Sequence, residues 1–138
     1  MSKETIISLL LSIPLGIISG LYAGVVVARY QRFADLRLQA KKVILEIDWI
    51  WEEDRMVFPR RTNVREFSTI ASDLLSLSHK AAGTNVLEIQ YSVTRTISEA
   101  SDGRVNFEEF SESMGNWQYR IRSLAPQAFT ILKIWGGL

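Results

Sequence analysis

Residues 5–28 read TIISLLLSIPLGIISGLYAGVVVA, and this stretch decides the fold because it carries no charged side chain. At a helical rise of about 1.5 Å per residue it extends roughly 36 Å, which exceeds the ~30 Å hydrocarbon core of a bilayer. We therefore predict an uncleaved transmembrane helix. A cleaved signal peptide is the alternative, but the basic residues follow this segment, and the apolar run is longer than the usual core of a signal peptide.

The charges that follow the span predict its orientation. Residues 29–42 carry five basic side chains and a single acid, Asp35. An excess of Lys and Arg next to a span marks the cytoplasmic side, and it also attracts anionic membrane lipids. We expect a single-pass protein of the cell inner membrane with its C-terminal domain in the cytoplasm. The basic residues are Arg29, Arg32, Arg37, Lys41 and Lys42.

The small residues of the span recur at a fixed interval of four. This spacing keeps them on nearly one face of a helix. Within the series, Gly16-x-x-x-Gly20-x-x-x-Gly24 doubles the motif that lets membrane helices approach closely. We predict self-association of the span through this face, and the lining of a narrow pore is the bolder alternative. The positions are Ser8, Ser12, Gly16, Gly20, Gly24 and Ala28.

Apolar residues continue at steps of three and four beyond the span, and neither Pro nor Gly interrupts residues 25–58. We therefore predict one helix from about Thr5 to Arg55, roughly 75 Å long. Its apolar positions form a seam that is typical of a coiled coil between protomers, although packing within the same chain is an equally good destination. The seam consists of Phe33, Leu36, Ala40, Val43, Ile47 and Ile50.

The chain after Pro59 has the signals of several shorter helices. Asn63 with Glu66, and Asn106 with Glu109, each match a capping box. No stretch alternates as a strand does, and short connections predict antiparallel neighbours. The expected helices run from Asn63 to a stop at Gly83, from a cap at Thr84 to a turn at 101–103, from Asn106 to about Leu124, and from Phe129 to Trp135.

The predicted fold class is all-α, with a single N-terminal transmembrane helix that continues into a cytoplasmic helical bundle. We divide the chain into a transmembrane segment at residues 1–28, a juxtamembrane helix at 29–58 and the helical bundle at 59–138.

The composition excludes several kinds of reactive site. With no cysteine and one histidine, the chain offers no thiol nucleophile, no thiolate ligand and no cluster of His ligands within one protomer. No base accompanies the serines in a triad pattern. We expect no enzymatic activity, no cofactor and no metal. The single histidine, His79, lies near a predicted helix C-terminus, where we expect it to be exposed or to cap the helix.

A cluster of arginines is the best candidate for a ligand site. It surrounds the predicted helix start at Asn63, and guanidinium groups together with free backbone N–H groups favour phosphate. The acidic run at residues 46–54 precedes the cluster directly, so pairing with these neighbours is the alternative. The candidates are Arg55, Arg60, Arg61 and Arg65.

This layout resembles the small membrane effectors of bacterial antiphage systems, such as the nucleotide-responsive channel proteins of Hailong-type and CRISPR-associated systems. The span from Ser8 to Ala28, the seam from Phe33 to Ile50 and the Arg60-Arg61 pair carry the resemblance, which covers the layout of the whole chain. It implies a homo-oligomer, tetrameric or larger, that acts as an ion channel in antiviral defence under the control of a nucleotide or oligonucleotide.

Two functions follow as expectations. The first is an oligomeric membrane effector or channel whose bundle senses a ligand or partner. The alternative is a non-conducting membrane anchor or adaptor whose bundle recruits a cytoplasmic protein partner.

Overall fold

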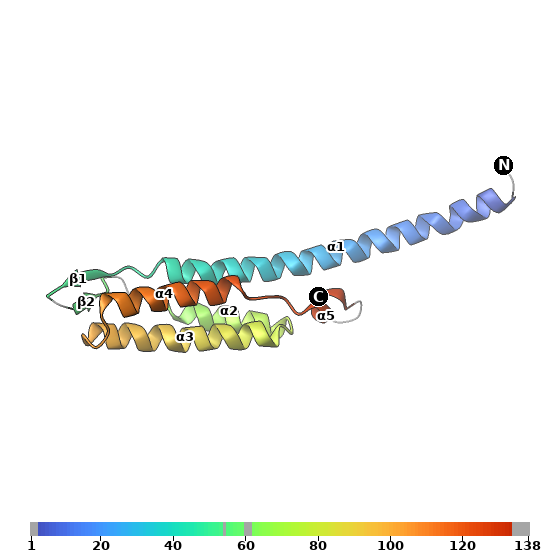
Figure 1. Cartoon of the computed structure of the whole chain (residues 1–138). Helices are drawn as coiled ribbons and strands as arrows, with labels where there is room; N and C mark the ends of the chain where they lie inside the picture. Colours follow the sequence, from blue (N-terminus) through green and yellow to red (C-terminus); the bar gives the residue numbers. More distant parts are fainter. Residues whose placement is uncertain (1–2, 54, 60–61, 134–138) are drawn as a thin grey trace.

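The computed structural model describes residues 3–53, 55–59 and 62–133, and they are mostly helical. A long helix, α1 (Lys3–Leu45), precedes the shorter helices α2 (Arg65–Ser76), α3 (Lys80–Ser101), α4 (Phe107–Arg122) and α5 (Ala128–Leu132). Figure 1 shows the N-terminal half of α1 projecting alone from one end of a helical bundle. The helical class and the long apolar N-terminal helix are thus confirmed.

Helix α1 passes through two environments without a break. From residue 4 to residue 32 its described side chains are exposed or half-buried, and Phe33 is the first one to be buried. Among the described residues, α1 is the one helix that is long and apolar enough to cross a membrane. At 43 residues it extends about 65 Å, so one continuous rod contains both the apolar segment and a helix of the bundle.

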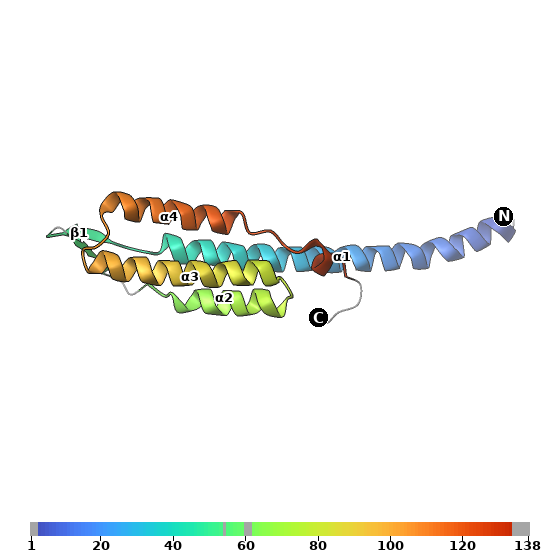
Figure 2. The ribbon, with the colours of Figure 1, turned by 60° about the horizontal axis from the view of Figure 1, so that its bottom comes forward.

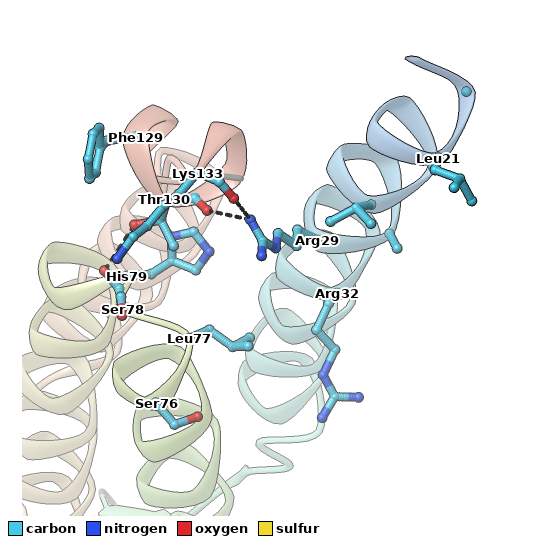
Figure 3. Close-up of a pocket in the computed structure, with 14 residues that line it drawn as sticks. Leu21, Arg29, Arg32, Ser76, Leu77, Ser78, His79, Phe129, Thr130 and Lys133 are labelled. Carbon is cyan, nitrogen blue, oxygen red and sulfur yellow. Dashed lines mark hydrogen bonds between the residues drawn. The ribbon is translucent and has the colours of Figure 1, made fainter. Parts of the chain in front are cut away.

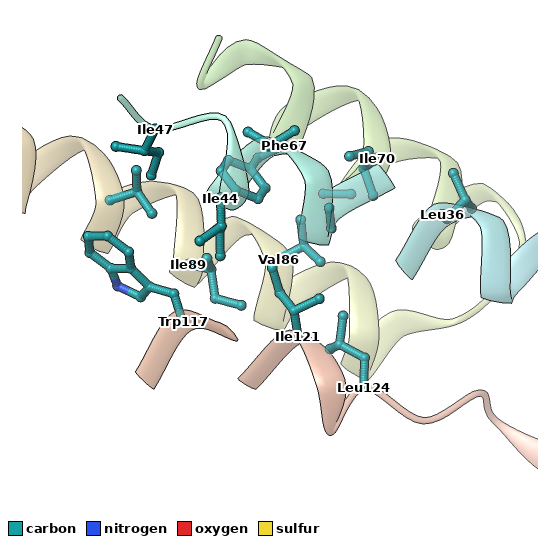
Figure 4. Close-up of a cluster of buried hydrophobic side chains, with 14 of the residues drawn as sticks. Leu36, Ile44, Ile47, Phe67, Ile70, Val86, Ile89, Trp117, Ile121 and Leu124 are labelled. Carbon is teal, nitrogen blue, oxygen red and sulfur yellow. The ribbon is translucent and has the colours of Figure 1, made fainter. Parts of the chain in front are cut away.

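The bundle has four helices in a closed arrangement. The C-terminal half of α1 contacts α2 and α4, and α3 contacts the same two helices from the other side. Figures 1 and 2 show consecutive helices running in opposite directions, as the short connections predict. Each helix turns an apolar face toward a common core (Figure 4). Its largest fully buried side chains include Trp117, Phe33, Phe67, Phe110, Leu36 and Ile44.

The prediction that α1 reaches Arg55 is wrong, because the helix ends at Leu45. An antiparallel hairpin of β1 (Ile50–Glu52) and β2 (Arg55–Val57) follows, with Trp51 opposite Met56. The hairpin folds the chain back, so that Met56 is buried in the core. A continuing helix would carry such side chains past the end of the bundle.

Two predicted boundaries near α2 are also wrong. The helix starts at Arg65 with Val64 as its N-cap, and the Asn63 amide contacts the Glu66 carboxylate instead of capping the backbone. At the other end, Ser78 adopts a left-handed conformation with φ 64°, the position that glycine usually takes after a helix. The N–H groups of Ser78 and His79 donate to the carbonyls of Leu75 and Leu74, which completes this turn.

Helix α3 therefore begins before the predicted stop, and Gly83 lies inside it instead of ending α2. The second capping box is confirmed. The Asn106 side chain accepts from the Glu109 N–H at 2.9 Å, and the Glu109 carboxylate accepts from the Asn106 N–H at 3.1 Å. The turn before it contains Gly103 with φ 71°. The last predicted helix is shorter than expected within the described residues, since α5 ends at Leu132 and Trp135 lies outside them.

Candidate functional site

The small-residue face of α1 is exposed along its whole length. All six positions of the series from Ser8 to Ala28 are exposed. A Cβ atom added at Gly16, Gly20 or Gly24 would meet no atom within 4 Å. Within the described residues, this face is therefore not filled by the protomer's own side chains, and another helix or a lipid chain has room to lie against it.

The predicted seam is divided between the core and the surface. Its first five members, Phe33, Leu36, Ala40, Val43 and Ile47, are buried within the protomer. The four-helix arrangement buries this face inside the protomer, so these five positions are not available as an oligomer seam. The structure has the other predicted arrangement, packing within the same chain. Ile50 differs, because it lies in β1 and is 43% exposed.

The two described members of the arginine cluster, Arg55 and Arg65, lie toward the end of the bundle that is remote from the free half of α1 (Figure 1). Arg55 belongs to β2 and Arg65 begins α2, and both are exposed. Arg60 and Arg61 lie outside the described residues. Glu52 is the register partner of Arg55 in the hairpin. No described carboxylate of the acidic run forms an ion pair with Arg55 or Arg65.

The prediction that His79 is exposed or caps a helix C-terminus is wrong, because the residue is buried with only 2% of its surface accessible. It lies between α2 and α3 as the N-cap residue of α3. Its ring meets the Phe33 ring edge-on at 4.9 Å, and its Nδ1 accepts a hydrogen bond from the Gln127 N–H at 3.2 Å. Burial lowers the pKa of His79 below its usual value, because the charged ring loses water. The imidazole therefore joins α1, the α2–α3 turn and the segment before α5.

A second candidate site lies at the end of the bundle nearest the free half of α1. A cavity of about 780 Å³ separates residues 20–32 of α1 from the α2–α3 turn and α5 (Figure 3). Three basic side chains, Arg29, Arg32 and Lys133, line it together with hydroxyl and apolar groups. None of the described residues lining it is acidic.

Helix α5 reaches this cavity because α1 holds it. The Arg29 guanidinium donates to the carbonyls of Thr130 at 3.3 Å and Ile131 at 3.5 Å, and also to the carbonyl of Lys133. The Tyr22 hydroxyl donates to the Leu132 carbonyl at 2.8 Å. These carbonyls at the end of α5 have no partner within their own helix, so Arg29 and Tyr22 satisfy them.

Sequence reasoning missed this site because its walls come from three separate parts of the chain. The available signals were the basic residues after the span and the apolar segment 128–135, which carries Lys133 as its only charge. Neither signal indicates that the C-terminal segment folds back beside α1. In the described residues, no group of three or more His, Cys, Asp or Glu side chains is placed to hold a metal ion.

The comparisons with known proteins give no further guidance to function. No family model, no curated protein and no solved structure matches the chain.

Proposed function

We propose that this chain is an uncleaved single-pass membrane protein that self-associates through α1 and acts as an oligomeric membrane effector or channel. The bundle would lie in the cytoplasm beneath the inner membrane, in agreement with the basic residues that follow the apolar segment. The single observation that carries the proposal is the continuity of α1, which joins an exposed apolar helix to the core of the bundle.

The continuity of α1 argues against a removable leader. Tyr22 and Arg29 both hold the C-terminal part of the chain, and residues from Phe33 onward belong to the core. A cut near Ala28 would remove the Tyr22 contact and leave the helix that begins the core without its first turns. A signal peptide is normally discarded without consequence for the folded domain.

The open face of α1 supports self-association. Gly16 has no neighbour within 4 Å of an added Cβ, and Ser12 and Ser8 continue the same face toward the N-terminus. Close contact between helix backbones in lipid relies on such small residues, because apolar burial gives little driving force there. The same helix enters the bundle rigidly, so a change in the bundle would move the spans relative to one another.

The bundle would sense a phosphate-bearing ligand, such as a nucleotide, at the arginine cluster. Arg55 and Arg65 are exposed, and no described carboxylate of the acidic run lies within ion-pair distance of them. This is the chemistry that the resemblance to antiphage effectors implies, and the ligand would act from the end of the bundle remote from the span.

The second candidate function is a non-conducting anchor or adaptor. The exposed hairpin favours it, because Ile50 and Trp51 are 43% and 46% exposed beside an acidic run. Exposed aromatic side chains with charged neighbours are typical of surfaces that bind another protein. In this case the partner would be a cytoplasmic protein with a basic surface.

Ion flux from vesicles distinguishes the two functions. The full chain is reconstituted into vesicles, and ion release is compared between wild type, Gly16→Leu and the control Ile18→Phe. Gly16 is chosen because it belongs to the small-residue face but not to the cavity. A channel should lose most of its flux in Gly16→Leu and keep it in Ile18→Phe, whose added bulk lies on the opposite face. If the wild-type protein integrates into the vesicles but releases no ions, the channel function is contradicted and the anchor function is supported.

A further inference from the structure

We propose that the cavity between α1 and α5 binds an anionic phospholipid from the surrounding bilayer. The inference rests on the part of the proposed function that places α1 across the membrane, but it does not depend on self-association or on conduction. It assigns a ligand class to a site distinct from Arg55 and Arg65, which lie toward the other end of the bundle (Figure 1).

The cavity lies at the depth where a lipid changes from acyl chain to headgroup. Its α1 wall begins at Gly20, within the apolar segment, and ends at Arg32, beyond it. Figures 1 and 2 agree that α5 lies beside α1 on the side of the bundle from which the free half of α1 projects. A helix that spans a bilayer as far as Ala28 would therefore place the cavity at the boundary between hydrocarbon and headgroups.

The wall of the cavity is apolar at one end and polar at the other. Figure 3 shows Leu21 and Phe129 toward one end of the site, and Arg32 and Ser76 toward the other. Leu21 and Phe129 are 68% and 79% exposed, so most of their apolar surface is open to the surroundings, where acyl chains would cover it in a bilayer. Gly20 and Gly24 leave the α1 backbone uncovered, which gives an acyl chain a smooth surface to lie against.

The polar end is suited to a phosphate group. Arg32 lies on α1 and Lys133 at the end of α5 on the opposite wall, while Ser76 and Ser78 belong to the end of α2 and the turn after it, which form a third side of the cavity (Figure 3). The Arg32 guanidinium forms an ion pair with the Asp73 carboxylate at 3.7 Å, and both side chains of this pair are well exposed. The described lining residues include no acid and carry a net positive charge, which anionic headgroups near a membrane surface match.

The shape of the site favours a phospholipid over a free nucleotide or a second copy of α1. A nucleotide would leave the apolar end unfilled, and Phe129 is the one aromatic ring among the described lining residues that stands at that end. A second α1 would bring its own Arg29 and Arg32 toward the same basic groups. An anionic phospholipid satisfies both ends at once, since it carries apolar chains and a negative phosphate in one molecule.

The test is native mass spectrometry of the full chain released from a nonionic detergent after reconstitution in equal amounts of phosphatidylglycerol and phosphatidylcholine. The wild type should retain phosphatidylglycerol in preference to phosphatidylcholine. The variant Arg32→Gln/Lys133→Gln should lose this retention about tenfold, because two basic groups near the headgroup are removed. The control Lys42→Gln/Arg104→Gln removes the same charge outside the cavity and should retain the lipid as the wild type does.

Each other outcome would overturn the proposal. Equal retention of the two lipids by the wild type would show that the site does not select anionic headgroups, whether or not the variants fold. Equal losses in both double variants would indicate general charge attraction. Displacement of the lipid by glycerol phosphate at equal concentration would assign a soluble anion. Bound lipid replaced by a second protomer in the spectrum would assign the cavity to another copy.

The proposed function is checked separately. Extraction with alkaline carbonate before the lipid measurement reports whether the chain is integrated in the vesicle. A chain that is washed off would contradict the membrane-spanning function itself. A chain that stays integrated without selective lipid retention would contradict the lipid site alone.

Discussion

Gly83 and Gly115 are both helical glycines, yet one added methyl group should affect them in opposite ways. At Gly83, where α3 crosses α2, an added Cβ would lie 2.7 Å from Leu75 Cγ and 3.1 Å from the Ala71 carbonyl oxygen. At Gly115, in the middle of α4, it would meet no atom within 4 Å. The first glycine permits close packing of two helices, and the second only lowers helix propensity.

We expect Gly83→Ala to destabilise the bundle by about 1–3 kcal/mol, as over-packing does, and Gly115→Ala to stabilise it by up to about 1 kcal/mol. Thermal unfolding of the full chain in nonionic detergent, followed by circular dichroism, measures both. Adding Leu75→Ala to Gly83→Ala should recover part of the loss. Equal effects of the two alanines would contradict the close crossing of α2 and α3.

The buried His79 should make stability depend on pH. Its pKa is lowered in the folded chain by burial, so between the two pKa values the unfolded chain binds more protons than the folded one. The stabilisation is complete above the unfolded pKa of about 6.5 and is lost as the pH falls toward the folded value. Because His79 is the only histidine, the effect is assignable to one residue.

When unfolding is measured from pH 7.5 down to pH 5, the free energy of unfolding should fall by at most about 1.4 kcal/mol per pH unit. The variant His79→Gln should be less stable at pH 7.5, but its free energy of unfolding should change less over the same pH range. A wild-type profile as flat as that of the variant would contradict the burial of the imidazole.

Local signals predicted some elements well. The capping box at Asn106 and the turn at Gly103 depend on residues only a few positions apart, and both are present. The end of α1 at Leu45 was not predictable in this way, because it depends on Met56 and Trp49 reaching the bundle. Trp49 packs against Phe107 and Phe110, residues of α4 that are distant in sequence. Tertiary contacts thus overrode a helical pattern that had no breaker.

The attachment of α5 is a testable property of that element. A five-residue helix has little stability alone, so its contacts with α1 should hold it in place. Arg29→Gln removes the guanidinium that donates to three carbonyls near the end of α5. Hydrogen exchange at residues 128–132 should become at least several-fold faster, while exchange in α3 stays unchanged.

The matched control is Arg37→Gln, which removes a guanidinium of α1 that contacts the Leu124 carbonyl before α5 begins. This variant should leave exchange in α5 close to that of the wild type. Identical exchange in all three proteins would contradict the role of Arg29.

At the scale of the whole molecule, sequence reasoning predicted the order of parts but not their contacts. The apolar segment, the basic residues after it and the helical domain are each properties of a continuous stretch. The cavity is not, since it forms only when Lys133 and Phe129 fold back beside Gly24 and Arg29. The seam also illustrates this limit, because the same apolar spacing suits an oligomer and a bundle core equally well, and Phe33 and Leu36 are in the core.

Copies of α1 should meet inside a membrane through the N-terminal part of the small-residue face, from Ser8 to Gly16, which lies outside the cavity. The natural absence of cysteine allows a direct test, because any disulfide must come from an introduced residue. Single cysteines are placed at Ser12 and Gly16 on the small-residue face, and at Leu10 and Ile18 on the opposite face. Each variant is expressed as the full chain, and isolated membranes are treated with a mild oxidant.

A disulfide requires Cα atoms within about 7 Å, so it reports helices in direct contact. We expect covalent dimers for Ser12→Cys and Gly16→Cys, and few or none for Leu10→Cys and Ile18→Cys. Equal dimer yields from both faces, or none from any membrane-integrated variant, would contradict it.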